Sequence, residues 1–281
     1  MKTTWTCTLT VKQALSICGS LSNPGKMPGH GYALPAYRCR LGLFLQQLPK
    51  TVCFHCYALR GRYMFPTVKA AMEKRLKSLT HPVWIDAVTT LIYRSKDRHF
   101  RWHDSGDLQS IEHLRNIIRV CKNLPRVKFW LPTREYQTVD AYRRMGGRIP
   151  SNLCIRLSAH LIDGKLPLGY GLPVRTVSSQ NTGSRSEAHV CPAPKQNNQC
   201  GTCRLLEPIG QDRELQAEVG QAHFSRGHAV RRPWPMRFLS NLIKLAAMLS
   251  RGKEGRCFSC ARMFTRSTTK HRAADQRASG P

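Results

Sequence analysis

The chain has 281 residues, and 41% of them are hydrophobic, which is enough for a sizeable core and excludes a largely disordered protein. Lys and Arg number 45 against 16 Asp and Glu, which gives a formal net charge of +29. A charge of this size favours a polyanionic partner, either nucleic acid or a small phosphate-bearing substrate. No apolar run reaches the roughly 18 residues that a transmembrane helix needs, so we expect none.

The 12 cysteines include Cys-x2-Cys pairs, and the first ten residues lack the character of a secretory signal. In a long chain this pattern is typical of reduced, metal-binding thiols and not of a disulfide framework. We therefore expect a cytoplasmic protein. Cys7, Cys18, Cys121 and Cys154 stand alone, and we expect each to be a small buried hydrophobic residue.

The chain opens with an alternating stretch over 4–11, followed by the Gly- and Pro-rich segment SNPGKMPGHGYALP, which we expect to be an extended loop that covers a site. Cys39 comes next, followed after thirteen residues by Cys53 and then by Cys56. A Cys-x2-Cys pair brings two sulfurs to one metal, and Cys39 can supply a third. Three interpretations are open: an iron-sulfur cluster with an open iron site, a zinc site closed by His55 or a fourth cysteine, or three unrelated buried thiols.

Apolar residues at helical spacing predict one helix over 68–79 and another over 84–92. Ser110 is expected to cap a third helix, which carries apolar residues on one face over 111–121. A short fourth helix is predicted over 138–145, where two glycines follow it.

Four short segments that alternate with these helices are predicted to be strands: 99–103, 127–131, 153–157 and 174–177. Each ends in a polar cluster, in turn HDSGD, PTRE, SAH and SSQN. The alternation favours βαβ units with parallel strands. The predicted fold class is therefore α/β, a partial TIM-like parallel barrel or sheet, with the polar clusters together at its carboxyl ends.

Six stretches of the chain carry a resemblance to a known family: SNPGKMPG, TVCFHCYALRGRY, FRWHDSGDLQSIEHL, WLPTREY, RLSAHLIDG and CPAPKQNNQCGTCR. They resemble the gene product 88 family of bacteriophage proteins, which has no established function. The resemblance implies a phage or prophage origin and covers roughly the first 205 residues. The Cys-x2-Cys-Tyr ending at Tyr57 and the order of the later elements are also similar to radical S-adenosylmethionine enzymes, among which some 7-carboxy-7-deazaguanine synthases have a long first arm.

The second resemblance implies cofactors and an activity. In radical S-adenosylmethionine enzymes three cysteines hold a cluster whose open iron chelates the amino and carboxylate groups of the cofactor. A turn after the next strand meets that amino group, and here the corresponding place holds Ser105, Gly106 and Asp107. The implied cofactors are an iron-sulfur cluster and S-adenosylmethionine. Tyr57 and Ser158 are expected to bind S-adenosylmethionine together with Ser105, Gly106 and Asp107. The implied activity is the modification of nucleic acid or a nucleoside.

The acidic residues leave further alternatives open. Asp107, Glu135 and Arg134 are the candidate catalytic residues, and carboxylates at neighbouring strand ends can also hold Mg²⁺ for a metal-dependent nuclease. In the structural alternative Asp104 or Asp107 only caps the next helix, and Arg134 pairs with a carboxylate. A non-enzymatic alternative is a zinc-stabilised nucleic-acid-binding protein. Further side chains are expected to line the site at the carboxyl ends of the strands: His103, Thr133, Arg156, Ser158 and His160.

A second cysteine cluster, in a turn-rich segment, predicts a second metal site at Cys191, Cys200 and Cys203. The family pattern implies a further Cys and a Trp at positions where this chain has Leu206 and Glu207. The fourth ligand of this site would therefore have to come from another residue: Cys257, Cys260 or His189.

We divide the chain into an α/β partial-barrel domain over 1–190, a Cys-rich metal-binding segment over 191–205 and a basic, divergent tail over 206–281. The resemblance is not found in the tail, which we expect to be weakly folded. An apolar helical face over 236–249 would let the tail contact a membrane surface or nucleic acid.

Overall fold

The computed structural model describes residues 5–6, 8–25, 27–179, 189–190, 196–197, 199–200 and 217–221, with the backbone alone for 189–190 and 217–221. The chain divides into two units, Met1–Ser225 and Arg226–Pro281, and all described residues lie in the first. The predicted tail helix and most of the predicted second metal site therefore lie outside the described residues.

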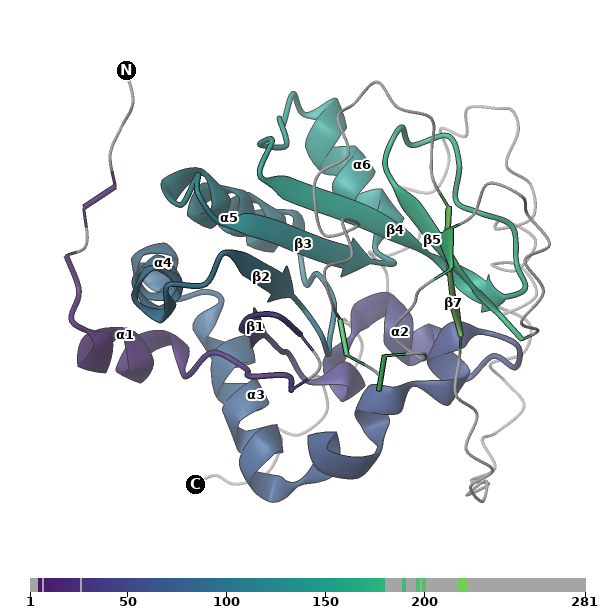
Figure 1. The fold of residues 1–281 in the computed structure, drawn as a ribbon, viewed down its shortest axis with the longest axis horizontal. Coiled ribbons are helices and arrows are strands. Elements are labelled where there is room, and N and C mark those ends of the chain that lie inside the picture. The colour runs from purple at the N-terminus through teal and green to yellow at the C-terminus, as the bar shows by residue number, and fades with distance from the viewer. Residues whose placement is uncertain are drawn as a thin grey trace, which may run out of the picture. The chain divides into compact units, whose positions relative to one another are not determined.

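The first unit is an α/β fold built on one parallel sheet (Figure 1). The strands stand in the order β1-β2-β3-β4-β5-β7-β6, and each neighbouring pair is parallel. Their bounds are β1 Gly31–Tyr32, β2 His99–Trp102, β3 Lys128–Thr133, β4 Leu153–Ile162, β5 Val174–Ser178, β6 His189–Val190 and β7 Ala217–Gln221. The four predicted strands are confirmed as β2 to β5, and their parallel pairing is confirmed with them.

The barrel part of the fold prediction is not confirmed, because the sheet is open within the described residues. The first five strands follow one another in space as they do in sequence, which is the winding of a barrel. Closure into a TIM-type barrel takes eight staggered strands, whereas the outermost strands here, β1 and β6, are two residues long. Strands this short leave too few backbone groups to pair with a further strand.

The helices agree with the sequence periodicity. Their bounds are α1 Val11–Cys18, α2 Arg40–Leu45, α3 Pro66–Ser78, α4 Trp84–Ser95, α5 Ile111–Asn123 and α6 Tyr136–Arg144. The Ser110 side chain accepts a hydrogen bond from the backbone N–H of His113 and so caps α5 as predicted. Helices α1 and α2 were not predicted, although Thr10 and Gln13 form a reciprocal capping box for α1 that its sequence contains.

The connections between successive strands place α4, α5 and α6 along one side of the sheet (Figure 1), as right-handed crossovers in a single direction require. The main apolar core lies between this helical layer and the sheet. Its centre is a group of aromatic rings that meet mostly edge to face at centroid distances of 5.1–6.2 Å: Tyr32, Trp84, Phe100, Trp102 and Phe129.

The opposite face of the sheet is polar and basic. Arg101 of β2 stands beside Trp130 of β3 in the strand register, and its guanidinium group lies 4.6 Å from the centre of the Trp130 ring. Arg156 of β4 approaches the same ring at 5.9 Å. Stacking on an aromatic ring stabilises these cations and contributes to holding Arg156, which is almost wholly buried.

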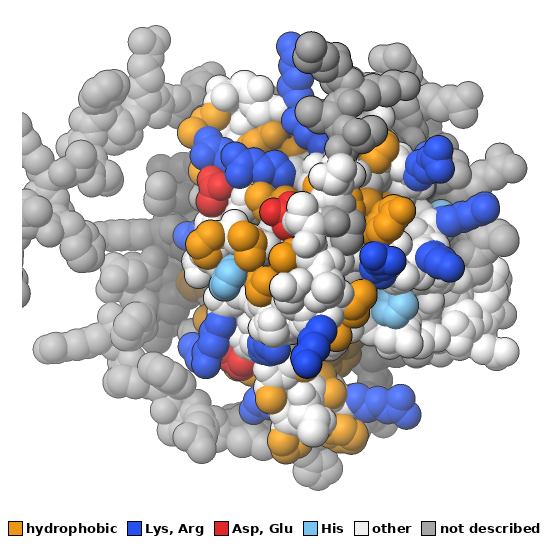
Figure 2. Space-filling view, turned by 90° about the vertical axis from the view of Figure 1, so that its left-hand side faces the viewer, with side chains coloured by type: hydrophobic (Ala, Val, Ile, Leu, Met, Phe, Trp, Pro, Cys, Tyr) orange, Lys and Arg blue, Asp and Glu red, His pale blue; other side chains and the backbone are white. Residues whose placement is uncertain are grey.

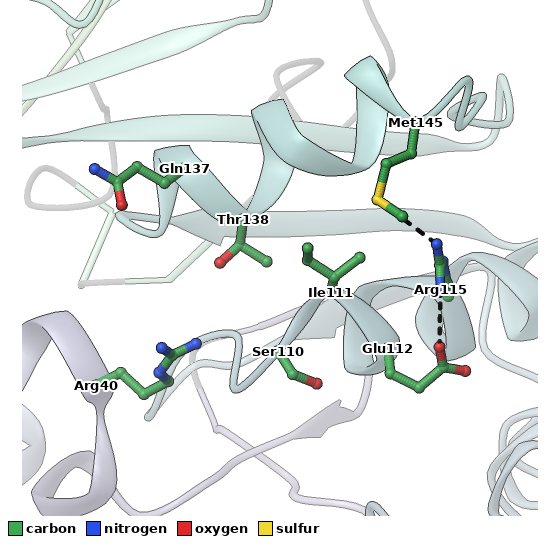
Figure 3. Close-up of a pocket in the computed structure, with 8 residues that line it drawn as sticks. All are labelled: Arg40, Ser110, Ile111, Glu112, Arg115, Gln137, Thr138 and Met145. Carbon is green, nitrogen blue, oxygen red and sulfur yellow. Dashed lines mark hydrogen bonds and ion pairs between the residues drawn. The ribbon is translucent and has the colours of Figure 1, made fainter. Parts of the chain in front are cut away.

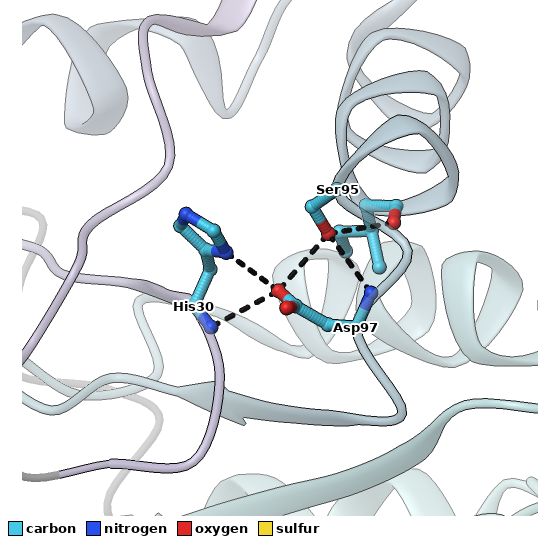
Figure 4. A network of polar contacts seen from close by, with 4 residues as sticks. His30, Ser95 and Asp97 are labelled. Atoms are coloured by element: carbon cyan, nitrogen blue, oxygen red, sulfur yellow. Dashed lines mark hydrogen bonds and ion pairs between the residues drawn. The ribbon is translucent and has the colours of Figure 1, made fainter.

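The Gly- and Pro-rich loop before β1 is tied to the start of β2 (Figure 4). Asp97 Oδ2 accepts hydrogen bonds from the backbone N–H of His30 at 3.0 Å and from Ser95 Oγ at 2.9 Å, and lies 2.6 Å from His30 Nδ1. A side chain at Gly29 would collide with the carbonyl oxygen of His99. The loop therefore packs directly on the edge of the sheet, as only glycine allows at this point.

We predict that a buried histidine makes folding depend on pH. Burial lowers the pKa of His103 from 6.5 to about 4, so the unfolded chain binds the proton more tightly than the folded one. The contribution of the neutral His103 ring to the free energy of unfolding is complete above pH 6.5 and is lost as the pH falls toward 4. At pH 5 the free energy of unfolding should have fallen by about 2 kcal/mol for this reason. His103→Asn, which is tolerated at the positive φ of this position, should make the free energy of unfolding less dependent on pH between 7.5 and 5 in urea titrations. Equal pH dependence of the two proteins would contradict this.

Candidate functional site

The cysteine segment, which we define as residues 36–65, lies between β1 and α3 and consists of α2 and short 3-10 turns. It is bound to the carboxyl ends of the strands (Figure 1). Thr51 forms an antiparallel bridge with Leu161 at the end of β4, and the backbone N–H of Ile162 donates to the carbonyl of Lys50 at 2.9 Å. The cysteine segment therefore lies at the carboxyl edge of the sheet, the edge at which the polar clusters were predicted to gather.

The three thiols of the segment lie near one another. Cys39 and Cys53 are buried, and Cys56 is half-buried. Burial raises the pKa of all three, and Asp107, followed by the thiolates of Cys56 and Cys53, raises that of Cys39 further. Arg134 opposes this shift at all three thiols, because its positive charge favours the thiolates. Within the described residues no three His, Cys, Asp or Glu side chains lie close enough together to hold a single metal ion.

Asp107 joins the loop after β2 to the end of β3. Its Oδ1 accepts hydrogen bonds from the Thr133 hydroxyl at 2.6 Å and from the backbone N–H of Leu108 at 2.7 Å, and its Oδ2 accepts one from the backbone N–H of Arg134 at 2.9 Å. Burial raises the pKa of Asp107, and these three donors counteract that shift. Ser110 and not Asp107 provides the side-chain cap of α5.

Glu135 connects the same strand end to the cysteine segment. Its Oε1 accepts a hydrogen bond at 2.9 Å from the backbone N–H of Leu41, in the first turn of α2. Its own backbone N–H donates to Thr133 Oγ1 at 3.0 Å. Burial raises the pKa of Glu135, which this backbone donor lowers in turn. Glu135 therefore caps the helix that begins directly after Cys39.

The HDSGD loop is fixed by contacts with residues far away in sequence. Asp104 accepts hydrogen bonds from Ser22 Oγ at Oδ1 and from the Tyr63 hydroxyl at Oδ2, both at 3.1 Å, while its carbonyl accepts one from the Tyr57 hydroxyl. Ser105 Oγ donates to the carbonyl of Leu34 at 2.8 Å. Gly106 has φ +84°, and a Cβ there would meet Leu34 at 2.5 Å. A glycine is thus required where this loop passes the end of β1.

The cluster after β4 lies beside Arg134. His160 Nε2 is 3.1 Å from the carbonyl oxygen of Arg134, and the His160 ring stacks on Tyr136 at a centroid distance of 4.4 Å. The Tyr136 hydroxyl donates to the carbonyl of buried Ser158. The structure thus brings HDSGD, PTRE and SAH together. Ser178 and Ser179 of the fourth cluster donate instead to Asp163, beyond the end of β4.

Three contributors to this site were missed in the sequence: Ser22, Leu41 and Tyr63. Each matters through one hydrogen bond to an acid between 41 and 94 positions away. Tyr63 belongs to the TVCFHCYALRGRY stretch, but no spacing rule connects it with Asp104. Of the predicted second metal site, Cys200 is described and half-buried, while Cys191 and Cys203 lie outside the described residues.

A groove of about 530 Å³ opens near the start of α2, between α5 and α6 (Figure 3). Arg40 lines it and donates to the carbonyl of Gln109 at 3.2 Å. On its far side Arg115 contacts Glu112 at 3.3 Å and the Met145 sulfur at 3.7 Å. The cysteines, Asp107 and Arg134 do not line this groove, which therefore stands apart from the cluster of polar residues described above.

A family model decides the affiliation of the chain: the model of gene product 88 matches residues 5–263. The chain belongs to the gene product 88 family. No curated protein and no solved structure matches the chain. In the part of the chain that the structure describes, no helix has the length and apolarity to cross a membrane.

The extent of the family match corrects one expectation. The resemblance was expected to end near residue 205, but the gene product 88 match continues to residue 263. Most of the segment taken for a divergent tail is therefore part of the family sequence. All six stretches that carried the resemblance lie before residue 205, so it gave no information about the later residues.

We predict that Asp107 stabilises the site through its three accepted hydrogen bonds. In Asp107→Asn an amide N–H₂ replaces one acceptor and faces a backbone or hydroxyl donor, so the free energy of unfolding should fall by about 1–3 kcal/mol. Asp140→Asn, in an exposed pair with Arg144 on α6, is the matched control and should cost less than about 0.5 kcal/mol. Equal unfolding midpoints for the two variants in urea would contradict the assignment.

Proposed function

We propose that the protein is an iron-sulfur protein with a radical S-adenosylmethionine-like activity, acting on nucleic acid or a nucleoside. One observation carries the proposal: Cys39, Cys53 and Cys56 lie together after β1, at the carboxyl edge of a parallel sheet, beside the loop that follows β2. In parallel α/β proteins the reaction site forms at this edge. The family itself brings no established function.

The donor set suits a cluster better than a single ion. Each cysteine of a cluster binds a different iron, so the thiols lie further apart than the ligands of one zinc ion. Thiols near enough to raise one another's pKa, without converging on a single point, agree with this arrangement. Arg134 favours the thiolates that a cluster requires. When bound, the cluster would supply one electron to S-adenosylmethionine and so cleave its bond from sulfur to the ribose carbon.

The protein residues would provide position and charge. We propose that Tyr57, Ser105, Gly106, Asp107 and Ser158 surround the cofactor. Both carboxylate oxygens of Asp107 already accept hydrogen bonds from the chain, so its contribution is to fix the loop that would face the cofactor. Glu135 positions the cysteine segment in the same way, through Leu41.

A zinc-stabilised nucleic-acid-binding protein is the second candidate. The observation in its favour is that residues 1–72 contain nine Lys and Arg and no acidic residue. A nuclease has less support, since Asp104, Asp107 and Glu135 each accept hydrogen bonds from the chain and do not converge on one ion. The metal content distinguishes the first two candidates.

We predict that protein purified without oxygen is brown and contains iron and sulfide in proportion. Cys39→Ala, Cys53→Ala and Cys56→Ala should each lose about four iron atoms per chain, the content of one cubane. Cys121→Ala, which removes a buried thiol on α5, is the control and should keep the metal. With dithionite and S-adenosylmethionine, only proteins that keep all three cysteines should form methionine and 5′-deoxyadenosine.

Two measurements would overturn this proposal, one of the bound metal and one of the cleavage of S-adenosylmethionine. Zinc in place of iron, in protein never exposed to air, would favour the binding protein over the enzyme. Iron without any cleavage of S-adenosylmethionine would leave an iron-sulfur protein and remove the enzymatic part.

A further inference from the structure

The positive charge does not by itself identify a binding surface. Figure 2 shows one face of the molecule, on which Lys and Arg side chains are scattered and no single patch stands out. A second property must therefore distinguish the contact surface from the remaining surface. Exposed aromatic rings among cations provide this property, because they bind bases as well as phosphates.

Such rings occur in the cysteine segment. Phe54, Tyr57 and Phe65 are 43%, 58% and 56% exposed, within twelve residues of one another. Arg60 and Arg62 lie between them and are exposed as well. We call these five residues the aromatic strip. Exposed aromatic residues in a short stretch cost solvation free energy in a soluble protein, and such clusters usually mark an interaction site.

Two of the rings in this segment are fixed in orientation. The Tyr57 hydroxyl donates to the carbonyl of Asp104, and the Tyr57 ring meets the edge of Tyr63 at 5.7 Å. Phe54 packs edge to face with His55 at 4.8 Å. A ring that is already held loses little conformational entropy when a planar ligand stacks on it. Tyr57 is therefore a ring of the strip that is already held in position for stacking.

The exposed charges of the strip are of one sign. The first acidic residue of the whole chain is Glu73, so the strip and all residues before it are free of carboxylates. The acid that contacts the strip in space, Asp104, is buried and its carboxylate accepts hydrogen bonds from the chain. The charges that the strip presents to solvent are therefore those of Arg60 and Arg62, which attract phosphates.

We propose that the aromatic strip binds single-stranded nucleic acid, with bases stacked on Phe54, Tyr57 and Phe65 and phosphates paired with Arg60 and Arg62. Stacking requires bases that are not already stacked in a duplex, and 3-10 turns are not suited to enter a major groove. A membrane surface is the weaker alternative, because the strip lacks the amphipathic helix that lies in a lipid interface.

The inference deepens the proposed function by naming the substrate class. Phe54 stands between the two thiols of the Cys53–Cys56 pair, and Tyr57 follows directly, so a strand bound to the strip would lie next to the candidate cluster. Only the role of the bound nucleic acid as a substrate rests on the proposed function. Binding itself requires neither S-adenosylmethionine nor its cleavage, so the two proposals can fail separately.

The test measures binding of the full-length protein, purified without oxygen, to a fluorescent thymidine oligonucleotide of about 15 nucleotides, close to the upper site size of single-strand-binding modules. Phe54→Ala with Phe65→Ala should raise the Kd by about tenfold or more, since each lost stack weakens binding several-fold. Tyr93→Ala removes a 56% exposed ring of α4 and is the matched control, which should leave the Kd unchanged.

Two further comparisons separate stacking from charge. Tyr57→Phe keeps the ring and should bind nearly as wild type does, whereas Tyr57→Ala should bind several-fold more weakly. Arg60→Ser with Arg62→Ser should weaken binding more than Arg94→Ser with Arg119→Ser, although both pairs remove two exposed cations. The Arg60→Ser with Arg62→Ser variant should also have a shallower dependence of Kd on salt than the wild type, whereas the aromatic variants should keep the wild-type dependence.

The proposal is overturned if the aromatic variants bind the oligonucleotide as tightly as the wild type. It is also overturned if a duplex of the same length binds equally well, or if anionic phosphatidylserine vesicles and not the oligonucleotide depend on Phe54 and Phe65. Circular dichroism melts establish that the variants are folded, because all substituted side chains of the strip are exposed. If binding is confirmed while S-adenosylmethionine is not cleaved, the strip stands and the enzymatic proposal falls.

Discussion

The site depends on a chain of hydrogen bonds that begins at the buried carboxylate of Asp107. Thr133 Oγ1 donates to Asp107 and accepts from the backbone N–H of Glu135, and the Glu135 carboxylate accepts from Leu41 in the cysteine segment. The loop after β2, the end of β3 and the start of α2 are therefore held in one arrangement. A buried carboxylate without partners would be costly, so each of these donors is required by the burial itself.

The sequence was sufficient for those parts of the fold that depend on local patterns. Ser110 and the apolar residues of α5 predict that helix completely, because capping and amphipathicity act within a few residues. The carboxyl-edge position of HDSGD, PTRE and SAH followed from the parallel alternation of strands and helices. Strand β1 could not be predicted, since two residues give no periodicity. Asp107 and Glu135 were expected to act on ligands, but their hydrogen bonds to the chain depend on contacts that no local pattern contains.

The few acidic residues explain why the surface is so positive. Several of them are used inside the fold: Asp97 holds the loop before β1, Asp104 holds two tyrosines, and Asp107 and Glu135 join the strand ends. On the face of the sheet opposite the helical layer, Arg101 and Arg156 stack on Trp130. Because these carboxylates are used inside the fold, few acids remain to pair with surface cations, and the field outside the molecule keeps the sign of the excess of 45 Lys and Arg over 16 Asp and Glu.

Tyr57 belongs to both the site and the surface, and this connects them physically. Its hydroxyl is bonded to the backbone of the HDSGD loop, while its ring is exposed in the aromatic strip. Asp104, whose carbonyl accepts that hydrogen bond, also holds Tyr63, against which the Tyr57 ring packs. A base stacked on Tyr57 would therefore press on a ring whose position is set by the loop beside the three cysteines. One side chain therefore connects the two, because the Tyr57 ring belongs to the strip while its hydroxyl is bonded to the loop.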